Sequence, residues 1–201
     1  MEPTYISAFP GIGTTRMFVG NDGNIYEASG GSRAWRNNNP GNLQDGSFAR
    51  DNGAIGSDGR FAIFPDTETG FNAMTNLLSS SAYKDLTIDD AIHKYAPSNE
   101  NNTENYLKFI ENQTGFSRLT TLNQLSKDNM LRLAKAMAKH EGNIPGKKRL
   151  VPKDEKYVWV TVGDDKVRPE HETLDGTIRT WYDSPHPGED YGCRCHAEEV
   201  E

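Results

Sequence analysis

The sequence predicts an α+β fold that is mainly helical, with a small β-containing module at the C-terminus. Three observations predict it. Four helix-period apolar stripes fill residues 66–142, alternating residues flank a turn at 21–23, and a clear strand pattern begins at 157. The predicted division is a first domain at 1–146, a linker at 147–156 and a small module at 157–201.

A β-hairpin is expected near the N-terminus, over residues 17–26. The segments 17–19 and 24–26 are rich in apolar residues and flank Asn21-Asp22-Gly23, a combination typical of tight hairpins. Residues 44–60 are rich in glycine and aspartate and are expected to form a loop. The segment 61–64 that follows reads as a short strand.

The four predicted helices have recognisable starts and ends. Asp66 or Thr67 can cap the first helix, and Thr87, Thr103 and Ser126 open the other three. Chain breakers end three of them at Pro97, Gly115 and Gly142. Their inward faces carry Phe71, Met74, Leu77 and Leu78; Ile88, Ala91, Ile92 and Tyr95; Tyr106, Phe109 and Ile110; and Met130, Ala134, Met137 and Ala138.

The segment after the last helix is charged and rich in breakers. Prolines and a glycine alternate with lysines and acids over 145–156, which favours a linker. Residues 157–162 then form the strongest strand pattern in the chain.

Composition narrows the possible functions. The formal net charge of -7 argues against a nucleic-acid partner, and a mean hydropathy of -0.77 predicts long polar loops around a modest core. No apolar run approaches the roughly 20 residues needed to span a bilayer, so membrane insertion is not expected. The first residues lack the basic and apolar regions of a signal peptide, so delivery outside the cytoplasm would need another carrier.

The most informative run is 33–43, where three asparagines precede Pro40 and Gly41. Such a run cannot form regular secondary structure and predicts a tight loop bonded through its side chains. Its amides beside an indole would suit a sugar polymer, and a purely structural turn is the alternative. The candidate sugar contacts are Trp35, Asn37, Asn38, Asn39 and Asn42.

This loop resembles the signature of phage and secretion-system proteins with a lysozyme-like muramidase fold. The resemblance continues through 53–65, 95–97, 100–103 and 140–142, and spans about residues 27–146. It implies a lysozyme-like helical domain and a glycoside hydrolase that cleaves the β-1,4 linkage of peptidoglycan without a catalytic cofactor. It also implies a phage lytic protein or an antibacterial effector that a virion or secretion system delivers to the periplasm or cell wall, with an immunity protein as a further partner.

Glu141 is the first candidate for the catalytic acid. Glycan cleavage needs a carboxylic acid that stays protonated near neutral pH. Glu141 continues the apolar stripe of Ala134 and Met137 and lies at the negative end of its helix, and both features raise a carboxyl pKa. His140-Glu141-Gly142 resembles the acid of phage-type lysozymes, which would make the fold a circular permutation of the usual order; an ordinary solvated helix end is the alternative.

Glu27 is the second candidate acid. Residues 27–31 resemble the Glu-Ser-Gly-Gly motif of lytic transglycosylases and glucosaminidases, although Ala28 interrupts it and a strand, not a helix, precedes it.

A second carboxylate could orient water or stabilise the developing positive charge on the sugar. Asp58 and Asp66 flank the strand at 61–64, with turn and cap roles as their alternatives, and Glu68 and Glu100 have weaker cases. Tyr95 could line the groove or pack in the core. The residues do not separate hydrolysis from lytic transglycosylation.

The tail carries a second set of motifs. Residues 167–176, 186–188 and 193–195 resemble the C-terminal module of head-morphogenesis proteins of Mu-like phages. His171, His186, Cys193, Cys195 and His196 supply metal-ligand atoms within 26 positions, and the first four could hold a structural zinc ion. A free thiol pair and a disulfide are the alternatives, and the module could instead cap the first domain or dock a delivery machine.

Three functions therefore remain open. The first is a muramidase, and the second is a non-catalytic glycan-binding or virion-assembly module. The third, a metal-dependent hydrolase in the tail, is disfavoured because no His-Glu-x-x-His or similar set is present.

Overall fold

The computed structural model describes residues 3–96, 103–190 and 192–200. Pro97, the expected end of the second predicted helix, and Glu100, a weaker candidate carboxylate, lie outside these ranges.

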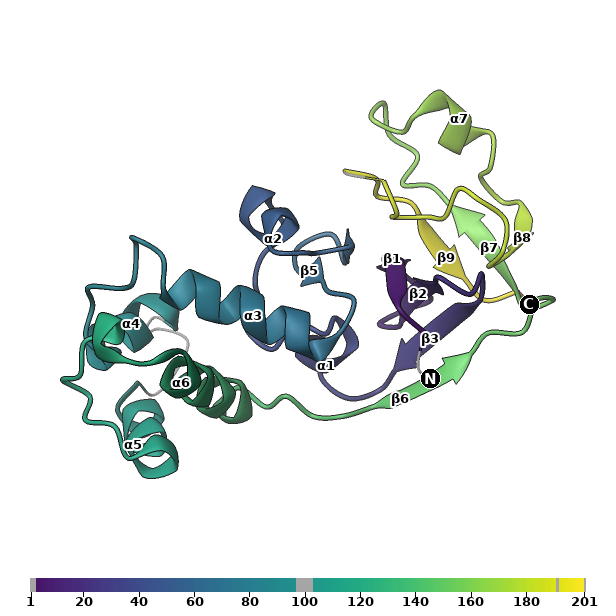
Figure 1. Cartoon of the computed structure of the whole chain (residues 1–201). Helices are drawn as coiled ribbons and strands as arrows, with labels where there is room; N and C mark the ends of the chain where they lie inside the picture. Colours follow the sequence, from purple (N-terminus) through teal and green to yellow (C-terminus); the bar gives the residue numbers. More distant parts are fainter. Residues whose placement is uncertain (1–2, 97–102, 191, 201) are drawn as a thin grey trace.

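A six-stranded mixed sheet forms the middle of the molecule (Figure 1). The predicted hairpin is present: β2 (Arg16–Gly20) pairs antiparallel with β3 (Ile25–Ser29) across the turn at 21–24. The sheet order is β5-β4-β1-β2-β3-β6, and β1 pairs parallel with β4. The remaining strands are β1 (Tyr5–Pro10), β4 (Gly56–Ser57), β5 (Ala62–Ile63) and β6 (Lys147–Leu150).

The four helices that the amphipathic stripes predicted are present, and they pack at one end of this sheet (Figure 1). Asp66, Thr87 and Ser126 accept hydrogen bonds from the first turns of their helices, as capping residues do. One apolar cluster unites the four helices and includes Met74, Ile92, Tyr106, Ile110 and Met137. The four are α3 (Thr67–Leu78), α4 (Ile88–Tyr95), α5 (Thr103–Thr114) and α6 (Lys127–His140), and the shorter helices are α1 (Arg33–Arg36), α2 (Ser47–Asp51) and the 3₁₀ turn Leu122–Gln124.

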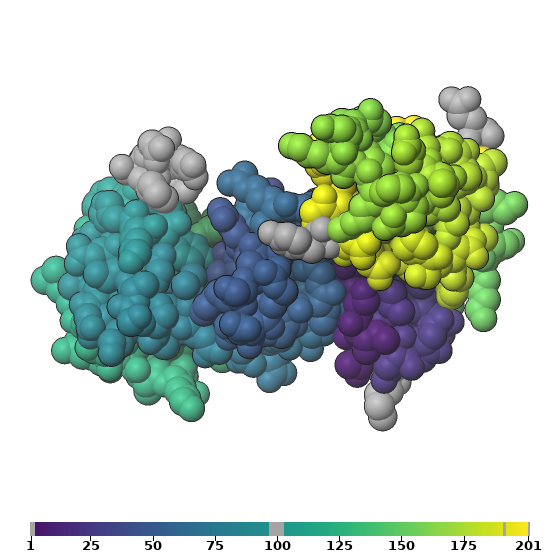
Figure 2. Space-filling model, turned by 90° about the horizontal axis from the view of Figure 1, so that it is seen from above, coloured from purple at the N-terminus to yellow at the C-terminus, as the bar shows by residue number. Residues whose placement is uncertain are grey.

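The C-terminal module is a three-stranded antiparallel sheet with one short helix. Its order is β8-β7-β9, from β7 (Lys156–Val160), β8 (Ile178–Thr180) and β9 (His196–Glu198), and its helix is α7 (Pro169–Glu172). Trp159 and Trp181 of the module are buried against Phe9 and Met17 of the first strands. The module therefore sits directly on the N-terminal strands, as Figure 2 shows.

This architecture corrects the predicted fold class. The structure has 32% helix and 20% strand, with a six-stranded and a three-stranded sheet, and it is not a mainly helical, lysozyme-like fold, permuted or otherwise. The expectation missed β1, which pairs with the nearby β2, and it missed β6 because the pairing of β6 is long-range: β6 joins β3 across about 120 residues, with Glu27 opposite Arg149. Local sequence patterns predict helices well, but they predict the pairing of strands that are far apart in the sequence poorly.

No helix in the described part of the chain combines the length and the apolar character that a bilayer-spanning segment needs.

Candidate functional site

The asparagine loop is a built element of the fold. Asn38 and Asn42 have positive φ angles of 48° and 45°, as the tolerance of asparagine for left-handed backbone predicted. Helix α3 lies close against the loop, because a Cβ added at Gly70 would be 2.0 Å from the carbonyl oxygen of Asn38. The left-handed asparagines and the close packing against the first turn of α3 therefore fix the conformation of the loop.

Three of the loop's amides are used inside the protein. Asn37, Asn38 and Asn39 are buried. The Asn38 amide donates to the carbonyl oxygens of Phe64 and Pro65 at 3.0 and 3.2 Å, and the Asn39 amide donates to those of Leu43 and Ala62, both at 2.9 Å. These side chains staple the loop to the strand after it, and they do not reach a surface where a sugar could bind.

Asp58 and Asn37 belong to a buried polar network. The Arg16 guanidinium donates to Asp58 Oδ2 and to Asn37 Oδ1, both at 2.8 Å. Asp58 also accepts from the backbone N–H groups of Arg60 and Phe61. Burial opposes its charge, but these hydrogen bonds and Arg16 outweigh that effect and lower the pKa of Asp58. Asp58 thus fixes the turn before β5, which was the alternative to a catalytic role.

A groove of about 610 Å³ opens beside the same loop, between it and the helices. Asn42 and Glu141 both line it and are in direct contact, because the Asn42 amide donates to Glu141 Oε2 at 3.3 Å. The other lining residues are Arg33, Gly41, Leu43, Gln44, Arg60, Phe61, Leu77, Tyr83, Tyr95 and Ala96. The structure therefore brings together two residues that the sequence singled out 99 positions apart.

Glu141 caps the end of α6 instead of extending its last turn. The residue as a whole is exposed, whereas its carboxylate lies against the helices, where the buried Tyr106 donates to Oε1 at 3.0 Å. Loss of water around the carboxylate raises the pKa of Glu141, and the hydrogen bonds from Tyr106 and Asn42 partly oppose the rise. A carboxyl with these surroundings is suited to proton donation.

Aromatic and cationic groups lie in the groove and beside it, and Tyr95 among them was already a candidate groove residue. Tyr106 is buried and does not line the groove; it stacks on His140, with the ring centroids 3.9 Å apart. The Arg33 guanidinium lies 3.8 Å from the Phe61 ring centroid. The Tyr95 hydroxyl donates to the Gly41 carbonyl oxygen, so Tyr95 both packs and lines the groove. The sequence pattern of α5 predicted that Tyr106 lies in the core, but it did not indicate that the Tyr106 hydroxyl reaches Glu141.

The other predicted site residues lie elsewhere. Glu27 is on β3, where its carboxylate forms a two-point ion pair with Arg149 at 3.1 and 2.9 Å. Trp35 packs against the cluster of Ala8, Phe18, Ala28 and Ile63 and does not line the groove. Asp66 caps α3, and Glu68 lies exposed in its first turn.

Three of the four predicted metal ligands form a second cluster, in the C-terminal module. Sγ atoms of Cys193 and Cys195 lie 3.5 and 3.7 Å from His171 Nδ1. The predicted fourth ligand, His186, is outside the cluster: its ring nitrogens contact Glu189 and the Trp181 carbonyl oxygen, and the ring stacks on Phe9. His196 contacts Glu198 on β9.

Comparison with known proteins identifies the class of this chain. The family model described as "Phage Mu protein F like protein" matches residues 90–198, which is more than half of the chain. The chain belongs to this family. The predicted resemblance of the tail to proteins of Mu-like phages is therefore confirmed, and the match extends into the helical part as far as α4.

A curated phage protein is also similar. "Protein P5" of Pseudoalteromonas phage PM2 is 37% identical over 101 residues, which cover 46% of this chain and 61% of that protein. The chain thus matches less than two thirds of its relative's length. Neither description mentions glycan cleavage, so the muramidase resemblance has no support from these comparisons.

Proposed function

We propose that this chain is a virion-assembly protein of a phage. The observation that carries the proposal is the family match, which runs from within α4 through α5 and α6 to the last strand of the docked module. The module buries two tryptophans against the N-terminal strands, so it is a fixed body and not a trailing segment. A firmly docked module with a polar surface is what we expect of a structural component of a phage particle.

The experiment is a deletion of the coding sequence in the phage or prophage that encodes the chain. Heads from the intact phage should contain the chain by mass spectrometry after gradient purification. The deletion should lower the yield of complete heads, and expression of the intact chain should restore it. Normal yields without the chain, together with its absence from purified heads, would contradict the proposal.

A second candidate function is cleavage of peptidoglycan glycan strands in the groove. The specific observation in its favour is Glu141, whose raised pKa and position beside Asn42 in a groove of about 610 Å³ suit a general acid. Arg33 and Arg60 would favour a substrate that carries carboxylates, as peptidoglycan does. A virion or secretion system would then carry the chain to the cell wall, and an immunity protein would protect the producing cell.

The test is clearing of purified cell walls by the full chain. Glu141→Gln should lower the clearing rate by about 100-fold or more, the range expected for loss of a general acid. Glu27→Gln should leave clearing unchanged, since Glu27 is outside the groove. Clearing that survives Glu141→Gln, or that a chelator abolishes, would overturn this mechanism.

Binding without cleavage is a distinct outcome of the same assay. A chain that sediments with cell walls but does not clear them would support glycan contact alone, and Asn42→Ala should then weaken the sedimentation. Where clearing occurs, mass spectrometry of the released fragments separates hydrolysis from lytic transglycosylation through the anhydro product. The thiol–imidazole cluster of the module is a feature apart from both functions.

A further inference from the structure

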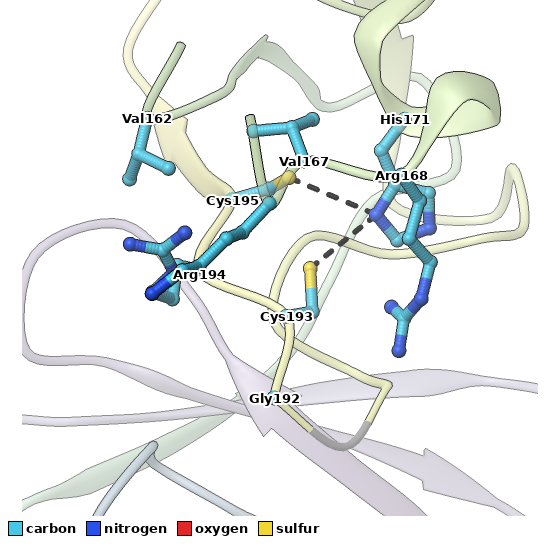
Figure 3. Close-up of a pocket in the computed structure, with 9 residues that line it drawn as sticks. Val162, Val167, Arg168, His171, Gly192, Cys193, Arg194 and Cys195 are labelled. Atoms are coloured by element: carbon cyan, nitrogen blue, oxygen red, sulfur yellow. Dashed lines mark hydrogen bonds between the residues drawn. The ribbon is translucent and has the colours of Figure 1, made fainter. Parts of the chain in front are cut away.

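Two thiols and an imidazole meet in a small cavity of the C-terminal module (Figure 3). The ligand atoms of His171, Cys193 and Cys195 all lie within 4.8 Å of one another. His171 is 3% exposed and Cys195 is 6% exposed, whereas Cys193 is half-buried and opens to the cavity of about 80 Å³. The three donors are therefore inside the protein, with one open side.

The distances between these donors fit a tetrahedral metal centre. Zinc binds thiolate sulfur at about 2.3 Å and imidazole nitrogen at about 2.0–2.1 Å. A tetrahedron with those bond lengths separates sulfur from nitrogen by about 3.6 Å. The two sulfur-to-nitrogen distances are 3.5 and 3.7 Å and match this separation, and the two sulfur atoms lie within 4.8 Å of each other.

A carboxylate is placed to orient the imidazole. Asp190 Oδ2 lies 3.5 Å from His171 Nε2, on the far side of the ring from the two sulfurs. With its proton on Nε2 toward Asp190, the ring presents the lone pair of Nδ1 to the thiols. Histidines that bind metals commonly have a carboxylate or a carbonyl at the other ring nitrogen. Trp159 packs edge-on against the same ring and limits its rotation.

Hydrogen bonds among His171, Cys193 and Cys195 are weak and cannot satisfy all three side chains. A thiol is a weak donor, and the single lone pair of Nδ1 faces two of them. A divalent cation would convert both thiols to thiolates, and the two thiolates would neutralise its charge.

We propose that His171 Nδ1, Cys193 Sγ and Cys195 Sγ bind a zinc ion, with a water molecule in the fourth position facing the cavity. On binding, each thiol releases its proton to solvent, and no electron transfer is involved. The ion would join α7, which carries His171, to the segment that leads into β9. This site is independent of the proposed assembly function and of the groove.

The test is metal binding by the full chain under reducing conditions. Zinc and cobalt(II) should each bind at one ion per chain, and the cobalt form should show the charge-transfer absorption of thiolate ligands. Cys193→Ser and His171→Gln should lower the zinc affinity by at least 100-fold, and Asp190→Asn by ~10–100-fold. Zinc should also raise the melting temperature of the wild-type chain.

The controls are His186→Gln and His196→Gln, since both histidines lie outside the cluster. These variants should keep one ion per chain and the wild-type cobalt spectrum. Circular dichroism identifies a variant that fails to fold, and the wild-type titration alone still decides the proposal. Absence of binding by reduced wild-type chain, or equal binding by Cys193→Ser, would overturn it, as would a Cys193–Cys195 disulfide that persists in reductant.

Discussion

The carboxylates of Asp58 and Glu141 lie in contrasting environments. Asp58 accepts hydrogen bonds from four groups, one of which is the Arg16 guanidinium, so the folded chain favours its charged form. Glu141 faces a groove wall with one tyrosine and one amide, so the folded chain favours its neutral form. The first arrangement suits a structural anchor and the second suits a proton donor.

Asp58→Asn should destabilise the protein strongly. The side chains of Arg16 and Asp58 are only 8% and 6% exposed, and removing one member of a buried pair costs about 3–5 kcal/mol. Because the pKa of Asp58 is lowered on folding, its contribution is complete above the unfolded value of about 3.9 and is lost as pH falls through the folded value. Urea unfolding from neutral to acid pH measures both effects.

The matched control is Asp45→Asn, which removes the exposed ion pair with Arg50. That pair is expected to contribute less than about 1 kcal/mol. Equal losses in the two variants would mean that the Arg16–Asp58 pair is not a structural anchor.

Tyr106→Phe should shift the pH dependence of the groove. Without the hydroxyl, the Glu141 carboxylate loses a donor, so the pKa of Glu141 should rise further. The alkaline limb of any wall-clearing activity should then move to higher pH. Carbon NMR titration of the carboxyl reports the same shift in the absence of activity, and Tyr83→Phe, whose ring lines the same groove, should leave it unchanged.

Glu141 also links stability to pH in the opposite sense to Asp58. A carboxyl with a raised folded pKa stabilises the fold below the unfolded value and loses that contribution as pH rises through the folded value. Glu141→Gln should therefore melt at a higher temperature than wild type at neutral pH, and the difference should vanish in acid. Thermal unfolding at both pH values is the measurement, and a lower melting temperature at neutral pH would contradict the assigned surroundings.

At the scale of the element, the asparagine loop and α3 depend on each other. The backbone of the loop passes so close to Gly70 that a side chain there would meet the Asn38 carbonyl oxygen. The loop also carries Asn42 to the groove, where its amide contacts Glu141. Packing between the loop and α3 thus helps to position Asn42 in the groove.

Gly70→Ala should widen or break this contact. Its added Cβ would be 2.0 Å from Asn38 oxygen, and overpacking of this kind costs about 1–3 kcal/mol. Gly46→Ala is the control, since a Cβ there meets nothing within 4 Å. Unfolding midpoints of the two variants give the comparison, and equal midpoints would show that the loop can move away freely.

The elements differ in how far the sequence predicts them. The helix starts at Asp66, Thr87 and Ser126 were predictable because a cap and its apolar stripe are local. Strand β6 was not, because Lys147–Leu150 is charged and exposed and becomes a strand only by pairing with β3. The loop's left-handed asparagines were predictable, but which amides turn inward depends on the strand they meet.

At the scale of the whole molecule, one core joins the two ends of the chain. Phe9 and Met17 share a buried cluster with Trp159, Trp181 and Ala197. The first hairpin and the C-terminal module are consequently two halves of one packed unit, while the helices form a separate core. The groove lies on the helical side and the thiol cluster on the module side.

Phe9→Ala should therefore destabilise the module as well as the first strands. Removing a buried phenylalanine costs about 3–5 kcal/mol, and the two module tryptophans report it through their fluorescence. The exposed Phe48→Ala should have little effect. A module that unfolded at its wild-type midpoint in Phe9→Ala would be an independent unit.

The core that joins the two ends also sets an order of events during synthesis. Phe9 and Met17 leave the ribosome well before Trp181 and Ala197, the partners that bury them and that follow more than 160 residues later. The helical cluster is complete once α6 has emerged and can form earlier. The nascent chain should thus carry exposed apolar strands while the helical part and the C-terminal module are still being made, which makes these strands a segment that a chaperone would protect.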